Sequence, residues 1–265
     1  MTDRRCLVAI CHNGPVVLTR TAQSLMELGW GNRVDEAKAA HGFVGIDFMW
    51  AQQFPRVDAM RDWAAERARR SGRYSHLLFL DADMVWPTDV LLRMLAHHDA
   101  GGIVSGHYCL KGGSHNPVAL INGRTLEGDS ITRYDYDLDF AEADGKTDAA
   151  GLRDVEVVGM GCTLIPMAVF DALGPRPWFA YEADADGWPV VSEDVPFCRA
   201  ARAAGFRVAW NPSIECGHAD VKVITPRWHR ASADGTIAAM LEMVKAAGGR
   251  RVPMIEARDP AEVEL

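Results

Sequence analysis

Short runs of consecutive apolar residues alternate along the chain with longer stretches in which apolar residues recur at helical spacing. The first pattern is typical of strands buried on both faces, and the second of helices with one buried face. Predicted strands cover 6–11, 42–49, 77–80, 103–105, 155–165 and 206–210, and predicted helices cover 16–28, 55–70, 87–98, 166–173, 193–204 and 232–247. This order predicts a doubly wound α/β fold in which 77–80 is a buried strand of a parallel sheet.

The segment 106–151 interrupts the alternation, because glycines, prolines and acids break it into short stretches. We interpret it as a small β excursion that is partly loop. Within the predicted strand 155–165, the sequence Gly159–Gly161 indicates a place where the backbone closely approaches another group. We expect a single domain over 1–230, followed by a helix and tail over 231–265.

The strand 77–80 is followed directly by Asp81, Ala82 and Asp83. In open α/β sheets, ligands bind at the carboxyl ends of the strands, where these carboxylates are expected to lie. Carboxylate oxygens at such a place suit a hard divalent cation. The simpler alternative is that one acid caps the turn while the other is solvated, and an isolated Asp-x-Asp does not decide between them.

Two further elements stand at comparable places. Glu193 and Asp194 open a helix for which Ser192 is the predicted N-cap, and His218 follows the last predicted strand. Two carboxylates and an imidazole form a suitable ligand set for Mn²⁺ or Mg²⁺, and a remaining acid can accept a proton. Each element also has a structural alternative, since acids complement the dipole at a helix start and many histidines are hydrogen-bonded structural groups.

Composition limits the class of protein and its compartment. The chain has 265 residues, 48% of them hydrophobic, which suffices for a full core without disulfides. Its formal net charge of −8 provides no overall attraction for nucleic acid. The six cysteines form no Cys-x-x-Cys pair, and no apolar run is long enough for a signal peptide or a membrane span. We therefore expect a cytoplasmic location, or the host cytoplasm if a phage encodes the protein.

Three stretches occur in the order LLFLDADM (77–84), GMGCTLIPMAVFDAL (159–173) and SEDVPFCRAARAAGFRVAWNPSIECGH (192–218). Together they resemble a GT-A fold glycosyltransferase, similar to family 2-like members encoded by bacteria and bacteriophages. The resemblance covers about residues 5–218. It implies a Rossmann-like, mixed and mainly parallel sheet with a small β excursion. It also implies metal-dependent transfer of a sugar from a nucleotide-sugar donor, a UDP- or GDP-sugar, to an acceptor hydroxyl.

The resemblance implies roles for particular residues. Asp83 would bind the metal ion directly, and His218 would be the third protein ligand of the set Asp81, Asp83 and His218. Within this set, Asp81 would contact the ribose of the donor or a metal-bound water. Asp194 matches the acid that removes the proton from the acceptor in inverting members, and Glu193 would contact the sugar or the acceptor. The other residues expected at the donor are His12, Asn13, Arg61, Ala82, Lys111 and Gly161.

Two departures leave details of this assignment open. Arg61 and Asp62 stand where an Arg-Asn pair is common in the family. A histidine ligand such as His218 also occurs in retaining members, which need no carboxylate base, so inversion is an expectation that the motifs do not decide. Lys111 would neutralise the leaving phosphate or, as a loop lysine, simply face solvent.

Other functions fit parts of the pattern. Residues 79–85 match the motif of haloacid-dehalogenase-like phosphatases, with Asp81 as the nucleophile, although that motif usually follows the first strand. A nucleotidyltransferase would share the fold class, but the loop after the first strand lacks the expected basic, glycine-rich sequence. A non-catalytic glycan-binding module would use Trp178 and Trp188 as stacking platforms. The acceptor stays open among a sugar, a lipid-linked glycan, a protein side chain and a hydroxylated base in phage DNA.

Overall fold

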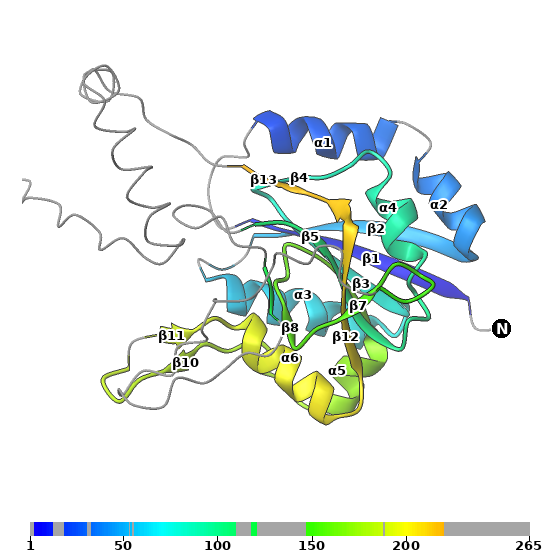
Figure 1. Ribbon diagram of the computed structural model, residues 1–265. Coiled ribbons are helices and arrows are strands. Elements are labelled where there is room, and N and C mark those ends of the chain that lie inside the picture. The colour runs from blue at the N-terminus through cyan, green and yellow to red at the C-terminus, as the bar shows by residue number, and fades with distance from the viewer. Residues whose placement is uncertain are drawn as a thin grey trace, which may run out of the picture. The chain divides into compact units, whose positions relative to one another are not determined.

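The computed structural model describes residues 3–12, 19–30, 33–52, 54, 56–109, 118–120, 147–187 and 189–219 (Figure 1). The helices in this part of the chain are α1 (Thr19–Trp30), α2 (Arg33–His41), α3 (Val57–Ser71), α4 (Val90–Leu95), α5 (Met167–Leu173) and α6 (Asp194–Ala203). The strands are β1 (Arg4–Cys11), β2 (Phe43–Ala51), β3 (His76–Asp81), β4 (Met84–Val85), β5 (Gly102–His107), β6 (Ala119–Leu120), β7 (Arg153–Asp154), β8 (Val157–Val158), β9 (Cys162–Pro166), β10 (Glu182–Ala183), β11 (Pro189–Val191), β12 (Arg207–Glu215) and β13 (Gly217–His218).

The main sheet has seven strands in the order β2-β1-β3-β9-β5-β12-β7. β1 is parallel to β2 and β3, and β5 is parallel to β12, whereas β9 runs antiparallel to both β3 and β5. The predicted α/β fold with a mixed sheet flanked by helices is confirmed. The expectation of a parallel setting for 77–80 is wrong on one side, because β9 starts at the edge where β3 ends and Leu80 pairs with Cys162.

Helices cover both faces of this sheet. Leu77 and Phe79 of β3 pack in a core with α3, α5 and α6, whereas Leu78 and Leu80 pack in a second core with α1, α2 and α4. The two sets of helices lie on opposite sides of the sheet in Figure 1. Burying each of these side chains contributes about 1.5–3 kcal/mol. β3 is therefore firmly held, and so is the point where it ends.

Two helices differ from their predictions. The helix α2 is not predicted, because only Val34 and Ala37 contribute apolar side chains from it to the core and its periodicity is weak. The helix α4 ends at Leu95 rather than at residue 98, because the amide of His98 donates a hydrogen bond to the carbonyl of Leu95, three residues back. The chain there forms tighter turns than an α-helix.

Several predictions lie outside the described residues. They concern Asn13, Lys111, Trp188, most of the excursion 106–151, the domain boundary near 230 and the helix 232–247. In the described ranges, no helix combines the length and the apolar character needed to cross a membrane.

Candidate functional site

The ends of β1 and β3 and the start of β9 meet at one edge of the sheet. Cys11, the last residue of β1, pairs with Asp81, the last residue of β3. The amide of Ala82 donates a hydrogen bond to the carbonyl of Cys11 (2.8 Å), and the amide of Asp81 donates one to the carbonyl of Gly161 (3.0 Å). Ala82 and Gly161 thus hold the backbone of the turn that carries Asp81 and Asp83.

Arg61 on α3 is buried and joins two of the predicted site acids. Its Nη2 donates to Oδ2 of Asp81 at 2.8 Å, and its Nη1 donates to Oε1 of Glu193 at the start of α6. Burial opposes the charge of Arg61, but the carboxylate of Asp81 and other neighbouring groups outweigh it, and the pKa of Arg61 is raised. We call Arg61, Asp81 and Glu193 the arginine clamp, because they tie α3, β3 and α6 together at the sheet edge.

Both carboxylate oxygens of Glu193 face donors from the protein. Oε1 receives the hydrogen bond from Arg61, and Oε2 accepts one from the hydroxyl of Ser192 at 2.9 Å. The prediction that Ser192 caps the helix is wrong, since α6 begins at Asp194, Glu193 occupies the N-cap position and no side chain caps the helix there. The physical reason is that the hydroxyl of Ser192 donates to the buried carboxylate of Glu193, which would cost free energy if it lacked donors.

Asp83 and His218 come from distant parts of the chain and lie together. β4 and β13 form an antiparallel pair in which His218 is opposite Met84, and the amide of Ala219 donates to the carbonyl of Asp83 at 2.7 Å. This pairing brings Nε2 of His218 to 3.5 Å from Oδ2 of Asp83. Nδ1 of His218 lies 2.8 Å from the carbonyl oxygen of Cys109. Because a carbonyl can only accept a hydrogen bond, Nδ1 carries a proton.

The residues of this pair suit a divalent cation. With Nδ1 protonated, a neutral His218 presents its Nε2 lone pair to Asp83, an arrangement typical of histidine ligands in metal sites. Adjacent ligand atoms of octahedral Mg²⁺ lie about 3 Å apart, close to the 3.5 Å between these two atoms. If Nε2 of His218 also carries a proton, its contact with Oδ2 of Asp83 is an ion pair instead.

The predicted set of three metal ligands is only partly assembled. In the described part of the chain, no three His, Cys, Asp or Glu side chains gather closely enough to hold a metal ion. Asp83 and His218 meet, whereas Asp81 directs Oδ2 to Arg61. A cation bound here would therefore take further oxygen ligands from a substrate or water.

Asp194, the predicted base, is the first residue of α6 and is partly accessible. Its Oδ1 atom is buried and has no hydrogen-bond donor among the described residues. Desolvation by the surrounding protein raises the pKa of Asp194, and the charge of Arg61 and the hydroxyl of Ser192 offset this only in part. A carboxylate with a raised pKa and an unused oxygen is suited to accept a proton.

Tyr108 is a site residue that the motifs do not reveal. It is buried directly after β5, and its Oη accepts a hydrogen bond from the amide of Gly161 at 2.9 Å. Its ring meets that of His218 edge to face, with 5.8 Å between centroids. A Cβ atom on Gly161 would lie 2.9 Å from Cζ of Tyr108, and one on Gly159 would overlap its hydroxyl. The predicted long strand therefore breaks between β8 and β9, and the available signal is a tyrosine that follows the buried strand 103–105.

Tyr181 is a second residue that the motifs miss, and it lies just before β10. Burial raises the pKa of Tyr181, Arg61 lowers it and Asp194 raises it, so the ring is within electrostatic reach of both charged groups. The guanidinium of Arg56 lies over the ring, 5.4 Å from its centroid. Only the aromatic content of the loop 178–188 points to this position in the sequence.

His12 and Asp62 have clear structural partners. His12 is buried at the end of β1, and its ring meets that of Trp50 edge to face with 6.2 Å between centroids. Oδ1 of Asp62 accepts hydrogen bonds from the amides of Trp178 (2.9 Å) and Phe179 (3.1 Å). The residue that departs from the Arg-Asn pattern thus anchors a loop, which the side-chain oxygen of an asparagine would also do.

No protein-family model matches the chain, and no curated protein matches it. Among solved structures, the chain is similar to A197 from STIV, with 19% identity, 83% of this chain and 97% of that chain covered, and a TM-score of 0.45. It is also similar to GalNAc-T7 with UDP, GalNAc and Mn²⁺, at 13% identity over 83% of this chain and 44% of that chain, with a TM-score of 0.47. A third similarity is to the catalytic domain of Drosophila beta1,4galactosyltransferase 7 in complex with xylobiose, at 15% identity over 85% and 73% of the two chains, with a TM-score of 0.42.

The chain thus spans less than half of the GalNAc-T7 chain that it matches. All of these TM-scores are below 0.5, so the likenesses decide nothing about the reaction.

Proposed function

We propose that this protein is a metal-dependent glycosyltransferase that moves a sugar from a UDP- or GDP-sugar to a hydroxyl group of an acceptor. The observation that carries the proposal is the contact between Asp83 and His218, next to the arginine clamp and Asp194. This arrangement offers a binding site for a cation and a separate acid for proton transfer. Both stand at the edge of the sheet where α/β proteins bind ligands.

Asp83 and His218 are the residues that would hold Mn²⁺ or Mg²⁺ in this proposal. The cation would supply positive charge for the diphosphate of the donor. Arg61 is not available for that task, because Asp81 and Glu193 occupy its two terminal nitrogens. Oδ1 of Asp81 is buried without a hydrogen-bond partner among the described residues, and we assign it to the ribose of the donor.

Asp194 is the general base of the proposed reaction. Its carboxylate takes the proton of the acceptor hydroxyl while that oxygen forms a bond to the anomeric carbon of the donor sugar. The bond from this carbon to the diphosphate oxygen breaks, and the nucleoside diphosphate leaves with the electron pair. Attack opposite the leaving group inverts the configuration at the anomeric carbon. Glu193 acts through Arg61 rather than on the substrate, since both its oxygens are engaged.

Three donor-side assignments stay predictions. His12 would lie against the nucleoside from the end of β1, and Asn13 and Lys111 lie outside the described residues. The phosphatase alternative is less well supported, because the buried Arg61 holds Oδ2 of its nucleophile, Asp81. A binding module would need no proton acceptor such as Asp194, whose Oδ1 has no hydrogen-bond donor among the described residues.

The test is a thermal-shift and calorimetric titration against a panel of nucleotide sugars, in Mn²⁺ and in chelator. We expect one nucleotide sugar to raise the Tm, and only when Mn²⁺ is present. NMR of the product with an accepted sugar would then show an inverted anomeric configuration. Equal stabilisation in chelator would reject the cation role. No stabilisation by any donor, together with metal-dependent release of phosphate from a phosphate ester, would favour the phosphatase.

A further inference from the structure

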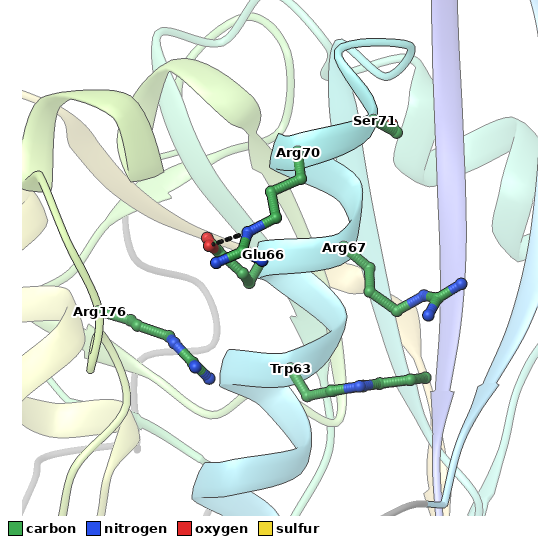
Figure 2. A pocket seen from close by; sticks show the side chains of 6 residues that line it. All are labelled: Trp63, Glu66, Arg67, Arg70, Ser71 and Arg176. Carbon is green, nitrogen blue, oxygen red and sulfur yellow. Dashed lines mark hydrogen bonds and ion pairs between the residues drawn. The ribbon is translucent and has the colours of Figure 1, made fainter.

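A hollow of about 480 Å³ lies over the last turns of α3, apart from the candidate site. Its lining residues are Trp63, Glu66, Arg67, Arg70, Ser71 and Arg176, which we call the arginine trough. Figure 2 shows Arg176 reaching toward α3 from a separate segment, while the other labelled side chains come from the helix itself. No residue of the arginine clamp lines it. Arg61 and Arg70 stand about 13 Å apart along the helix axis at 1.5 Å per residue.

The trough is strongly basic in a protein that is acidic overall. It contains three arginines and one acid, whereas the whole chain carries a formal net charge of −8. The acid, Glu66, is already neutralised, because it accepts hydrogen bonds from Arg69 (3.1 Å) and Arg70 (2.5 Å). The hydrogen bond from Arg69, together with that from Arg70, lowers the pKa of Glu66. Among the described residues, neither Arg67 nor Arg176 has a hydrogen-bonded acid, and Arg176 acts on the carboxylate of Asp62 only through its charge.

Two of the three guanidinium groups, and the loop that carries the third, are held in place before any ligand arrives. Arg67 lies over the ring of Trp63, 5.1 Å from its centroid, and Arg70 is fixed by Glu66. The loop that carries Arg176 is pinned to α3, since Asp62 accepts the amides of the two residues that follow Pro177. Side chains ordered in advance lose little entropy on binding, so their charges are well placed for a ligand.

We propose that the arginine trough binds a phosphate-bearing small molecule, with its phosphate oxygens received by Arg67, Arg70 and Arg176. The planar guanidinium fork matches phosphate oxygens with two parallel hydrogen bonds, which a lysine does not do. Trp63 adds an apolar wall beside them. The volume exceeds what a single phosphate needs, so the rest of the ligand also fits in the trough. The proposal is independent of the reaction proposed above.

The experiment is isothermal titration calorimetry of the full chain with pyrophosphate, in chelator so that binding at Asp83 and His218 through a metal is excluded. The variants are Arg67→Gln/Arg176→Gln and the control Arg202→Gln, which changes an exposed α6 arginine far from the trough in sequence. We expect the double variant to lose about tenfold or more in affinity, since each lost charged hydrogen bond is worth about that factor. The control is expected to bind like the unaltered protein. Circular dichroism establishes that each variant is folded.

A second arm identifies the source of the phosphate group. The protein is sedimented with vesicles of phosphatidylcholine alone and with vesicles that also contain phosphatidic acid. Pyrophosphate binding without vesicle binding supports a soluble ligand, and vesicle binding that the double substitution abolishes supports a lipid headgroup. Equal pyrophosphate affinity in all variants, no binding to either probe, or vesicle binding that survives the double substitution would overturn the proposal.

Discussion

The arginine clamp and the Asp83–His218 pair lie at the same edge of the sheet but balance their charges differently. In the clamp, the side chains of Arg61 and Glu193 are only 5% and 3% exposed and neutralise each other inside the protein. In the pair, His218 and Asp83 are 20% and 44% exposed and approach no closer than 3.5 Å. The clamp pairs its charges with one another, although Oδ1 of Asp81 has no hydrogen-bond partner among the described residues, whereas the pair is more exposed and open to a ligand. The two acids of one Asp-x-Asp motif therefore differ, because Asp81 gives one oxygen to the clamp whereas Asp83 contacts His218 at the surface.

Removing the arginine of the clamp is expected to have the largest effect. Arg61→Met leaves Glu193 as a buried charge without its main partner, which costs about 3–5 kcal/mol of the free energy of unfolding. Urea denaturation followed by circular dichroism measures this loss. The double variant Arg61→Met/Glu193→Gln is the matched control and should recover a large part of it. A loss in Arg61→Met of only about 0.5 kcal/mol, as for a surface substitution, would show that the clamp does not hold the site.

Removing the proposed base tests whether Asp194 acts in chemistry rather than in the clamp. Asp194→Asn should lower turnover on the order of 10²-fold or more, because the acceptor hydroxyl loses its proton acceptor. Donor binding in calorimetry should stay nearly unchanged. Asp186→Asn, an exposed acid in the turn between β10 and β11, is the control and should retain full turnover. If Asp194→Asn turns over normally, the reaction needs no base at this position, and a retaining mechanism is favoured.

The same variant carries a pH signature. The pKa of Asp194 is raised in the folded protein. Ionisation of Asp194 at pH values above that pKa therefore lowers the free energy of unfolding. Asp194→Asn should therefore be at least as stable as the unaltered protein at neutral pH. The difference should vanish as the pH falls below the unfolded-state pKa, where both states bind the proton. A variant that is less stable at neutral pH would contradict the sign of the shift.

Removing an acid from the open pair should affect metal binding without affecting the fold. Mn²⁺ at about 100 times its Kd stabilises a protein by about 2.7 kcal/mol, and Asp83→Asn should lose most of this. In chelator, the Tm of the variant should equal that of the unaltered protein, in contrast to Arg61→Met. Asp89→Asn, which changes an acid paired with Arg93 at 2.9 Å, is the control. Undiminished stabilisation of Asp83→Asn by Mn²⁺ would reject the assignment.

Tyr108 lies between the two regions, and its hydroxyl should have the smallest effect. Tyr108→Phe removes the acceptor for the amide of Gly161 and leaves this buried donor unpaired, at a cost of about 1–3 kcal/mol. The Tm should fall accordingly, and turnover should fall modestly because Gly161 holds the amide of Asp81. Tyr74→Phe is the control, because Tyr74 is partly buried and precedes β3, whereas Asp81 is the last residue of that strand. An unchanged Tm in Tyr108→Phe would mean that water replaces the hydroxyl.

The order of helices and strands is largely readable from the sequence, because burial on both faces leaves consecutive apolar residues such as Leu77 to Leu80. The same local pattern marks where the acids Asp81 and Asp83 leave the sheet. The helix α2 cannot be predicted from the sequence, because few of its apolar residues reach the core. The antiparallel direction of β9 cannot be predicted either, because it depends on the route of the chain between strands. The cap role of Ser192 fails for a similar reason, because a nonlocal partner of Glu193 sets the local hydrogen bonding.

The sequence by itself determined the α/β architecture and the set of acids and imidazole available for chemistry, since both follow from residue types and their local spacing. Only the tertiary structure decided which of these groups are partners. Arg61 and Glu193 are 132 positions apart, and their contact exists because α3 and α6 pack on the same face of the sheet. The β4–β13 pairing likewise brings His218 to Asp83. Charge pairing acts over a few ångströms in space, and folding alone sets which distant residues come that close.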